Sequence, residues 1–187
     1  MSVTVDELLQ ALHAGVAGKL DVSSLTDAIE ALVEAQPEDS RKAIHAYTGD
    51  ERLRLWALGL LGDPRDFPVL AAGLADPELR STALEALAGQ PDATRVDEIA
   101  RSFLDDADPM VRSRAVRMVA FSARPGALAV LSPLAQDPIP HVRMILGWCL
   151  GGLGDQAAEP TLRTLLADPD EQVRAFAAHG LRRLNRP

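Results

Sequence analysis

The chain has 187 residues, of which 47% are hydrophobic and only 4% aromatic, and its formal net charge is −8. This length suits one sizeable domain or a short array of repeats, and a content dominated by Leu and Ala favours packed helices over sheets. The charge argues against a broad nucleic-acid footprint, because all the excess acidity lies in residues 1–95, and it leaves room for a local basic patch in residues 96–187.

Cysteine content and hydropathy exclude several further classes of protein. Cys149 is the only cysteine, so an internal disulfide, a zinc ribbon and a CxxC redox motif are all excluded. The N-terminal MSVTVDELLQ has no basic segment followed by an apolar one, as a signal peptide would. The longest uncharged apolar-rich run, MILGWCLGGLG, is too short to span a bilayer. We therefore expect a soluble, cytoplasmic protein.

Residues 1–49 fit the pattern of the later chain poorly. Three segments, TVDELLQALHAGV, SSLTDAIEALVEAQ and PEDSRKAIHAYTG, each have the spacing of an amphipathic helix. Repeat arrays need terminal units with a polar outer face. We predict that residues 1–49 form an acidic helical N-terminal cap or degenerate repeat, and that residues 50–187 form the repeat array of one continuous domain.

An arginine preceded by Leu or Val recurs five times from residue 54 onward. Three and four residues after it come small or apolar pairs, and seven residues after it comes Leu or Val. Offsets of −1, +3, +4 and +7 share one face of an α-helix, so the pattern predicts five helices with the same buried face. The five arginines are Arg54, Arg80, Arg112, Arg143 and Arg174.

Asp-Pro pairs precede four of these helices, an arrangement typical of an N-cap followed by proline in the first turn. The last two pairs stand two residues further from the arginine, so their helices are expected to begin later. Another apolar segment precedes each Asp-Pro pair, and glycine or proline follows each second helix. Each repeat is therefore predicted to be a helical hairpin, which buries its apolar face by stacking on its neighbours.

Two stretches carry a resemblance to a known family. ALGLLGDPRDFPVLAAGLADPELRSTALEALAG and LGGLGDQAAEPTLRTLLADPDEQVRAFAAHGLRRL resemble the short HEAT-like repeat associated with phycobilisome lyases, over roughly residues 50–187. The resemblance implies an all-α fold, a right-handed α-solenoid of about five helical hairpins preceded by the N-terminal helical cap. The repeat serves many scaffolds and adaptors, so it indicates a fold more than a function.

The recurring arginine has a structural interpretation. A guanidinium at this position of every repeat is suited to bind the carboxylate or the exposed carbonyls of a neighbouring Asp-Pro turn. We expect this role for Arg112 and its equivalents.

A candidate binding surface lies two and five residues after the arginine, away from the buried face. In the third to fifth repeats these offsets hold arginine, aromatic residues and histidine, the composition of many interaction surfaces. Stacked second helices would align them along the inner, concave surface, whereas the alternative is ordinary solvated arginine and a partly packed tryptophan. The candidate partner-binding residues are Arg114, Arg117, Trp148, Phe176 and His179.

No pattern indicates catalysis, a cofactor or a metal site. Cys149 lies beside the predicted core with no adjacent base, and is expected to be a small buried hydrophobe. The four histidines are scattered, and no H-x-x-x-H, H-E-x-x-H or His-Glu pair occurs, although a HEAT-repeat iron hydroxylase family binds its metal through His-Glu pairs. The glycines near residue 150 lack the Lys-Ser sequel of a phosphate-binding loop, and Gly154 is expected to end a helix.

Three functions fit these observations. The preferred one is a non-catalytic scaffold or adaptor that binds a protein or peptide on its concave face, where Arg114 and Arg117 favour an acidic partner. The resemblance also implies a bilin lyase-type subunit or chaperone, in which Trp148 would stack on an open-chain tetrapyrrole and Arg114 or Arg117 would pair with its propionates. The third is a nucleic-acid-binding protein similar to HEAT-like DNA glycosylases, which the net charge disfavours.

Overall fold

The computed structural model describes residues 9–10, 22–122 and 124–185. Within these ranges the backbone forms helices and turns and contains no strand, as expected for an all-α repeat protein. None of the helices in the described ranges is long and apolar enough to cross a membrane. The contacts between residues divide the chain into two compact units, Met1–Pro91 (unit 1) and Asp92–Pro187 (unit 2).

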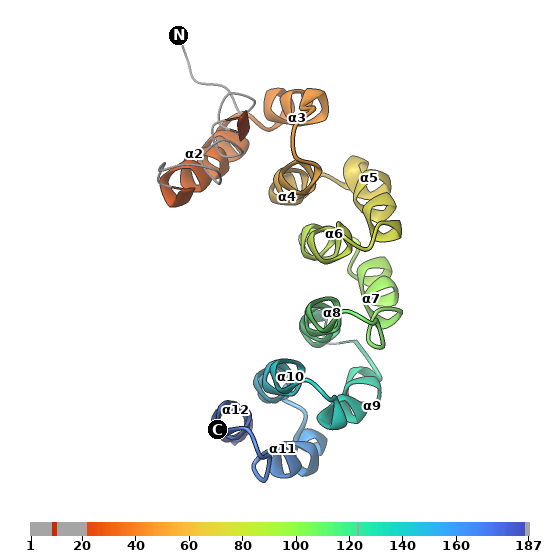
Figure 1. Cartoon of the computed structure of the whole chain (residues 1–187), viewed down its shortest axis with the longest axis vertical. Helices are drawn as coiled ribbons and strands as arrows, with labels where there is room; N and C mark the ends of the chain where they lie inside the picture. Colours follow the sequence, from red (N-terminus) through yellow and green to blue (C-terminus); the bar gives the residue numbers. More distant parts are fainter. Residues whose placement is uncertain (1–8, 11–21, 123, 186–187) are drawn as a thin grey trace. The chain divides into compact units, whose positions relative to one another are not determined.

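Unit 1 holds two of the predicted hairpins and one preceding helix. Of the first predicted N-terminal helix only residues 9 and 10 are described, and the rest of that prediction lies outside the described residues. The second and third predicted segments are α2 and α3, and α4 packs against α2, α3 and α6 (Figure 1). The helices are α2 (Val22–Ala35), α3 (Pro37–Ala46), α4 (Glu51–Leu61), α5 (Phe67–Ala72) and α6 (Arg80–Leu87).

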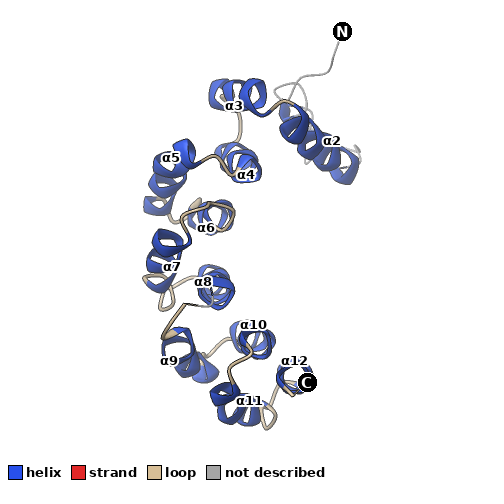
Figure 2. Ribbon diagram, turned by 180° about the vertical axis from the view of Figure 1, so that it is seen from behind, coloured by secondary structure: helices blue, strands red, loops and turns tan. Residues whose placement is uncertain are grey.

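Unit 2 holds three hairpins in two layers. The second helices α8, α10 and α12 follow one another on one side, and the shorter first helices α7, α9 and α11 lie on the other (Figures 1 and 2). Helix α10 packs along both α8 and α12. The helices are α7 (Ala93–Arg101), α8 (Pro109–Ser122), α9 (Ala127–Leu131), α10 (Pro140–Leu153), α11 (Glu159–Leu165) and α12 (Glu171–Leu184).

The buried face of the second helices follows the predicted offsets. On α8 the residues at −1, +3, +4 and +7 from the arginine are fully buried: Val111, Ala115, Val116 and Val119. The same offsets on α10 hold buried Leu and Val side chains around Gly147, and on α6 they bury Ala83, Leu84 and Leu87. The core of each unit therefore lies between its two layers of helices.

Two of the recurring arginines in unit 2 join one repeat to the next. Arg112 donates hydrogen bonds from Nε and Nη2 to the two carboxylate oxygens of Asp137, at 2.7 and 2.8 Å, and from Nη1 to the carbonyl of Asp106 at 2.8 Å. Arg143 does the same with Asp168, at 2.7 and 2.8 Å, and with the carbonyl of Asp137 at 2.7 Å. Each guanidinium thus binds its own turn and the aspartate of the following turn, as predicted. We call these two pairs the arginine–aspartate ladder.

The ladder lowers the pKa of both carboxyl groups. Burial opposes ionisation of Asp137, but hydrogen bonds from Arg112 and from the Ile139 N–H outweigh it, so the pKa falls below its usual value. The hydrogen bond from Arg143 lowers the pKa of Asp168 and outweighs the effect of burial. Both pairs are therefore ionised at neutral pH and nearly enclosed, with 5–11% of each side chain exposed.

Only some of the Asp-Pro pairs begin a helix. Helix α8 begins at Pro109 as predicted, and α10 and α12 begin later, at Pro140 and Glu171, as the longer spacing predicts. Asp76 departs from the prediction, because α6 begins only at Arg80. There the carboxylate accepts a hydrogen bond from the Glu78 N–H, at 2.9 Å. Asp108 accepts the equivalent bond from the Met110 N–H, at 2.8 Å, although α8 does begin at Pro109, so this bond does not account for the difference.

Glycines allow α10 and α12 to approach closely. A side chain at Gly151 would overlap the backbone of Gly180, and one at Gly180 would overlap the carbonyl of Gly147. Gly154 ends α10 in the left-handed conformation, at φ 69°, which glycine adopts without steric cost. Both the close approach and the helix end agree with the sequence.

Candidate functional site

The second helices of unit 2 share an exposed face beside their buried one. Residues +2, +5 and +9 from the repeating arginine lie on one side of each helix, because these offsets are separated by three and four residues. None of the nine residues at these positions is fully buried. The α8–α10–α12 face consists of Arg114, Arg117 and Phe121 on α8, Ile145, Trp148 and Gly152 on α10, and Phe176, His179 and Arg183 on α12.

All five residues predicted from the sequence lie on this face. Arg117 and His179 are exposed, and Phe176 is unusually exposed for a phenylalanine, at 37%. Arg114 and Trp148 are half-buried. Their shared face is established, and their binding of a partner stays a prediction.

Trp148 is the centre of an aromatic and basic cluster. The ring of Phe121 lies 5.6 Å from the Trp148 ring, centroid to centroid, and meets it edge-on at 76°. The guanidinium carbon of Arg183 lies 5.9 Å from the centroid of the Trp148 ring, within the range of a cation–π interaction. Phe121 is 65% exposed despite its contact with Trp148. Three helices thus contribute one side chain each to the cluster.

Gly152 explains how Arg183 can lie there. A β-carbon at residue 152 would come within 3.3–3.6 Å of the guanidinium atoms of Arg183. Because glycine has no such atom, the guanidinium can lie against α10 one turn beyond Trp148. A side chain that extends beyond its β-carbon at 152 would push the guanidinium outward.

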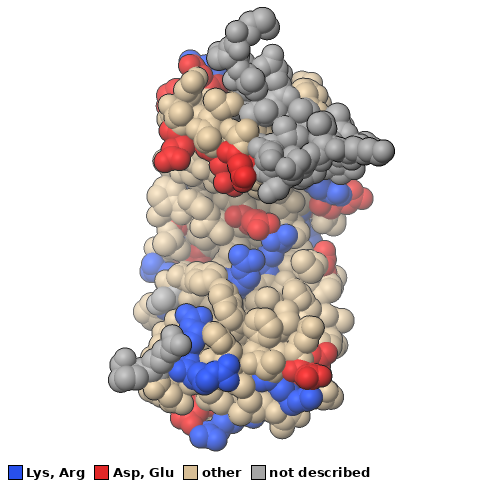
Figure 3. Space-filling view, turned by 90° about the vertical axis from the view of Figure 1, so that its left-hand side faces the viewer, with Lys and Arg blue, Asp and Glu red and all other residues tan. Residues whose placement is uncertain are grey.

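Positive charge predominates on this face. Helices α8, α10 and α12 hold seven arginines but one acidic residue, Glu171, in the first turn of α12. Neither Arg117 nor Arg183 forms an ion pair with a carboxylate of the described residues. Figure 3 views the side on which these helices lie, and Lys and Arg predominate over its lower half. The face is therefore suited to an anionic partner.

Cys149 lies beneath the face and is not a candidate nucleophile. Burial raises the pKa of its thiol to about 12, although the nearby positive charges of Arg117 and Arg183 act in the opposite direction. The thiol is 3% exposed and neutral at physiological pH. It serves as a small core residue, as predicted.

Sequence reasoning missed Phe121 and Arg183. Both stand nine residues after a repeating arginine, one helical turn beyond the +5 position. The +2 and +5 offsets define a helix face that continues to +9, so extending the periodicity by one turn finds both residues. Their contacts with Trp148 come from neighbouring helices, and no spacing within one helix predicts such contacts.

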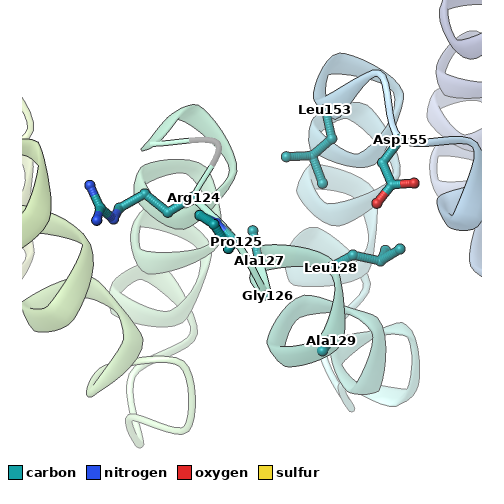
Figure 4. Close-up of a pocket in the computed structure, with 8 residues that line it drawn as sticks. All are labelled: Arg124, Pro125, Gly126, Ala127, Leu128, Ala129, Leu153 and Asp155. Carbon is teal, nitrogen blue, oxygen red and sulfur yellow. The ribbon is translucent and has the colours of Figure 1, made fainter.

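Other concave regions of unit 2 are less suited to binding. A pocket of about 500 Å³ lies between residues 124–129, which lead into α9, and the end of α10, where Leu153 and Asp155 line it (Figure 4). Its lining is mostly small or apolar, and Arg124 extends away from Asp155 (Figure 4). The described part of the chain also contains no group of three or more His, Cys, Asp or Glu side chains suited to hold a metal ion.

Comparison with known proteins identifies the repeat. A family model of HEAT repeats matches residues 68–145 and 134–187. No curated protein matches the sequence significantly. The repeat inferred from the arginine spacing is therefore confirmed.

Solved structures agree on the fold. The crystal structure of an engineered protein is similar with a TM-score of 0.59 and 20% identity, covering 96% of each chain. A second engineered protein has a TM-score of 0.57 and 19% identity, covering 97% of this chain and 54% of its own. A designed armadillo repeat protein has a TM-score of 0.53 and 18% identity, covering 97% of this chain and 100% of its own. At these identities the similarity concerns the fold alone, and it confirms the α-solenoid class.

Proposed function

Since the chain belongs to the HEAT-repeat family, we propose that it is a non-catalytic adaptor that binds a protein partner on the α8–α10–α12 face. Stacked helical hairpins form rigid, extended surfaces, and such surfaces commonly serve as binding sites. The proposal gives the protein no catalytic residue and no cofactor. Its binding residues are the five predicted from the sequence together with Phe121 and Arg183.

The observation that carries the proposal is the exposure of aromatic side chains among arginines. Phe121 and Phe176 are 65% and 37% exposed, and Trp148 connects Phe121 to Arg183. Exposing an aromatic ring to water is unfavourable in free energy, and a partner that covers the ring removes this cost. Tryptophan and arginine are also the residues most enriched among those that dominate binding energy.

The alternative ligands are less well supported. For an open-chain tetrapyrrole, Arg183 already lies over the Trp148 ring, which the sequence had suggested as the stacking surface. A nucleic acid would be repelled by unit 1, which carries 15 acidic and 7 basic residues. A protein partner fits both the charge and the apolar character of the face.

The proposal can be tested with a double variant, Arg117→Glu/Phe121→Ser, which changes two exposed side chains of the face. Proteins that bind the wild type in a native lysate would be identified by quantitative mass spectrometry, purified and titrated against both chains. We expect the double variant to bind its partner at least roughly tenfold more weakly, because side chains of this kind dominate binding energy.

A matched control changes the same kinds of side chain in the opposite layer of unit 2. Arg163 and Leu166, on and just after α11, are exposed, and Arg163→Glu/Leu166→Ser repeats both chemical changes there. The control should bind every partner as the wild type does, and both variants should keep the helical circular dichroism of the wild type. Equal affinity of the wild type and the Arg117→Glu/Phe121→Ser variant for every purified partner would refute the proposal.

A further inference from the structure

The Trp148 cluster has two features that together define what a partner must offer. Arg183 is a guanidinium held over an aromatic ring, and Phe121 is an apolar ring left mostly in water. We infer that the partner is a linear peptide segment in which a carboxylate binds Arg183 and a large apolar side chain, close to it in sequence, packs on Phe121. This inference rests on the proposed function and specifies the chemistry of its partner.

Arg183 is arranged to bind a carboxylate. Its guanidinium lies over Trp148 and beside Gly152. A planar guanidinium can donate two parallel hydrogen bonds to one carboxylate, which an ammonium group cannot do. No carboxylate of the described residues is paired with it, and helices α8 and α10 contain no acidic residue. A carboxylate of a partner can therefore bind Arg183 without displacing an acidic residue of the described chain.

Phe121 gives the second requirement. It extends from α8 at the side of Trp148, with its ring edge-on to the indole and 65% of its surface exposed. An aromatic or branched apolar side chain of the partner would cover this ring and remove both apolar surfaces from water. An acidic residue alone would leave this surface in water.

The distance between the two features limits the motif. Arg183 and Phe121 each lie less than 6 Å from the Trp148 ring. They are therefore at most about 12 Å apart, a distance that three to four residues of extended peptide span. The motif is thus an Asp or Glu within about three or four positions of an aromatic residue, Leu or Ile.

The inference can be tested without knowing the natural partner. A random peptide library displayed on phage would be selected on the immobilised full chain, and the enriched peptides would be synthesised with their acidic residue present or replaced by the corresponding amide. We expect enriched peptides with an acid next to a large apolar residue. Replacing that acid should weaken binding by roughly tenfold, the effect of losing a charged hydrogen-bonded pair.

Variants of the chain test whether the peptide carboxylate needs the planar guanidinium of Arg183 in its observed position or only a positive charge. Arg183→Lys keeps the charge but loses the planar donors, and Gly152→Leu keeps Arg183 but displaces it from α10. Both should bind the acidic and the amide peptide almost equally, whereas the wild type prefers the acidic one roughly tenfold. Gly152→Ala adds only a β-carbon and should retain most of the preference. All three variants should keep wild-type helical circular dichroism.

Each other outcome overturns a particular statement. Enriched peptides that lack an acid but lose affinity with Phe121→Ala would overturn this inference and leave the proposed function standing. A preference for the acidic peptide that Arg183→Lys retains would reduce the site to a simple positive charge and also overturn the inference. No enrichment at all would overturn the inference alone, because a folded partner would still bind the face. Concentration-dependent self-association that Phe121→Ala abolishes would overturn both the inference and the proposed binding of a separate partner.

Discussion

The second helices of the two units carry the same arginine at the same position, but the partners of these arginines differ. In unit 2, Arg112 and Arg143 each bind an aspartate 25 residues further along the chain. In unit 1, Arg54 instead binds Glu51 on its own helix, and Arg80 donates to the carbonyl of Leu74, at 2.9 Å. The arginine at this position therefore binds an aspartate of the following repeat in Arg112 and Arg143, and a glutamate of its own helix in Arg54.

The charge of the second helices also differs between the two units. Helices α4 and α6 of unit 1 carry three arginines and two glutamates, whereas α8, α10 and α12 carry seven arginines and one glutamate. Because the ladder binds two of the seven within the core layer, it adds no charge to the exposed face of unit 2. The ladder and the proposed binding residues therefore occupy different positions of one repeat, so stability and the proposed binding can vary independently.

The largest expected effect comes from breaking one ladder pair. Arg143→Leu leaves Asp168 nearly enclosed without its partner and should lower the free energy of unfolding by roughly 3 kcal/mol. Arg54→Leu removes a pair in which Glu51 is 42% exposed, and should cost less than about 1 kcal/mol. Urea unfolding monitored by circular dichroism measures both losses.

A second substitution identifies the cause of that loss. Arg143→Leu/Asp168→Asn should recover part of the lost stability, because the enclosed negative charge is removed. Equal losses for Arg143→Leu and Arg54→Leu would remove the distinction between the two units.

A smaller loss is expected where α10 meets α12. Gly151→Ala places a β-carbon against the Gly180 backbone, which cannot move aside easily, and should lower the free energy of unfolding by roughly 2 kcal/mol. The neighbouring Gly152→Ala meets only the flexible end of Arg183, and should be neutral or gain up to about 1 kcal/mol from its higher helix propensity. Thermal and urea unfolding of the two variants give the comparison.

The same experiment extends to unit 1, where a β-carbon at Gly59 would lie 2.7 Å from Cα of Ala86. A comparable loss for Gly59→Ala would show that close helix approach is common to both units. If Gly151→Ala is as stable as Gly152→Ala, the close approach is not required.

Acidification should produce the smallest loss. The folded-state pKa values of Asp137 and Asp168 are lowered, so the stability that these groups contribute is complete above the unfolded pKa of about 3.9. It is lost as the pH falls through the lower folded-state values. Urea unfolding between pH 7 and pH 2 should therefore show a decline beginning near pH 4, and Asp168→Asn should reduce it.

Unit 1 offers an internal reference for this decline. The hydrogen bonds from Arg65 lower the pKa of Asp63 to about 2, but these residues are two positions apart and can remain paired in the unfolded chain. The ladder pairs are 25 residues apart and exist only in the folded chain. A decline that Asp168→Asn leaves unchanged would assign the acid sensitivity to groups other than the ladder.

Much of the fold could be predicted from the sequence, because the same pattern of buried residues recurs in several repeats. The offsets of the buried residues predict the core of α8 residue by residue, and the spacing after Asp137-Pro138 predicts the later start of α10. Asp76 shows the limit, since α6 begins only at Arg80 although Asp76 and Asp108 make equivalent local hydrogen bonds. Likewise, the contact of Arg183 with Trp148 depends on how α10 and α12 pack, and Gly151 and Gly180 set how closely these helices approach.

The ladder also has an evolutionary consequence. Each pair of the ladder needs only an arginine and an aspartate 25 residues later, and Arg112, Arg143 and Arg174 stand 31 residues apart. Duplicating or deleting one whole repeat therefore reproduces the spacing on both sides of the new junction. An array built in this way can change its length by recombination, because each added repeat brings the residues of its own stabilising pair. The exposed positions of each copy can then diverge.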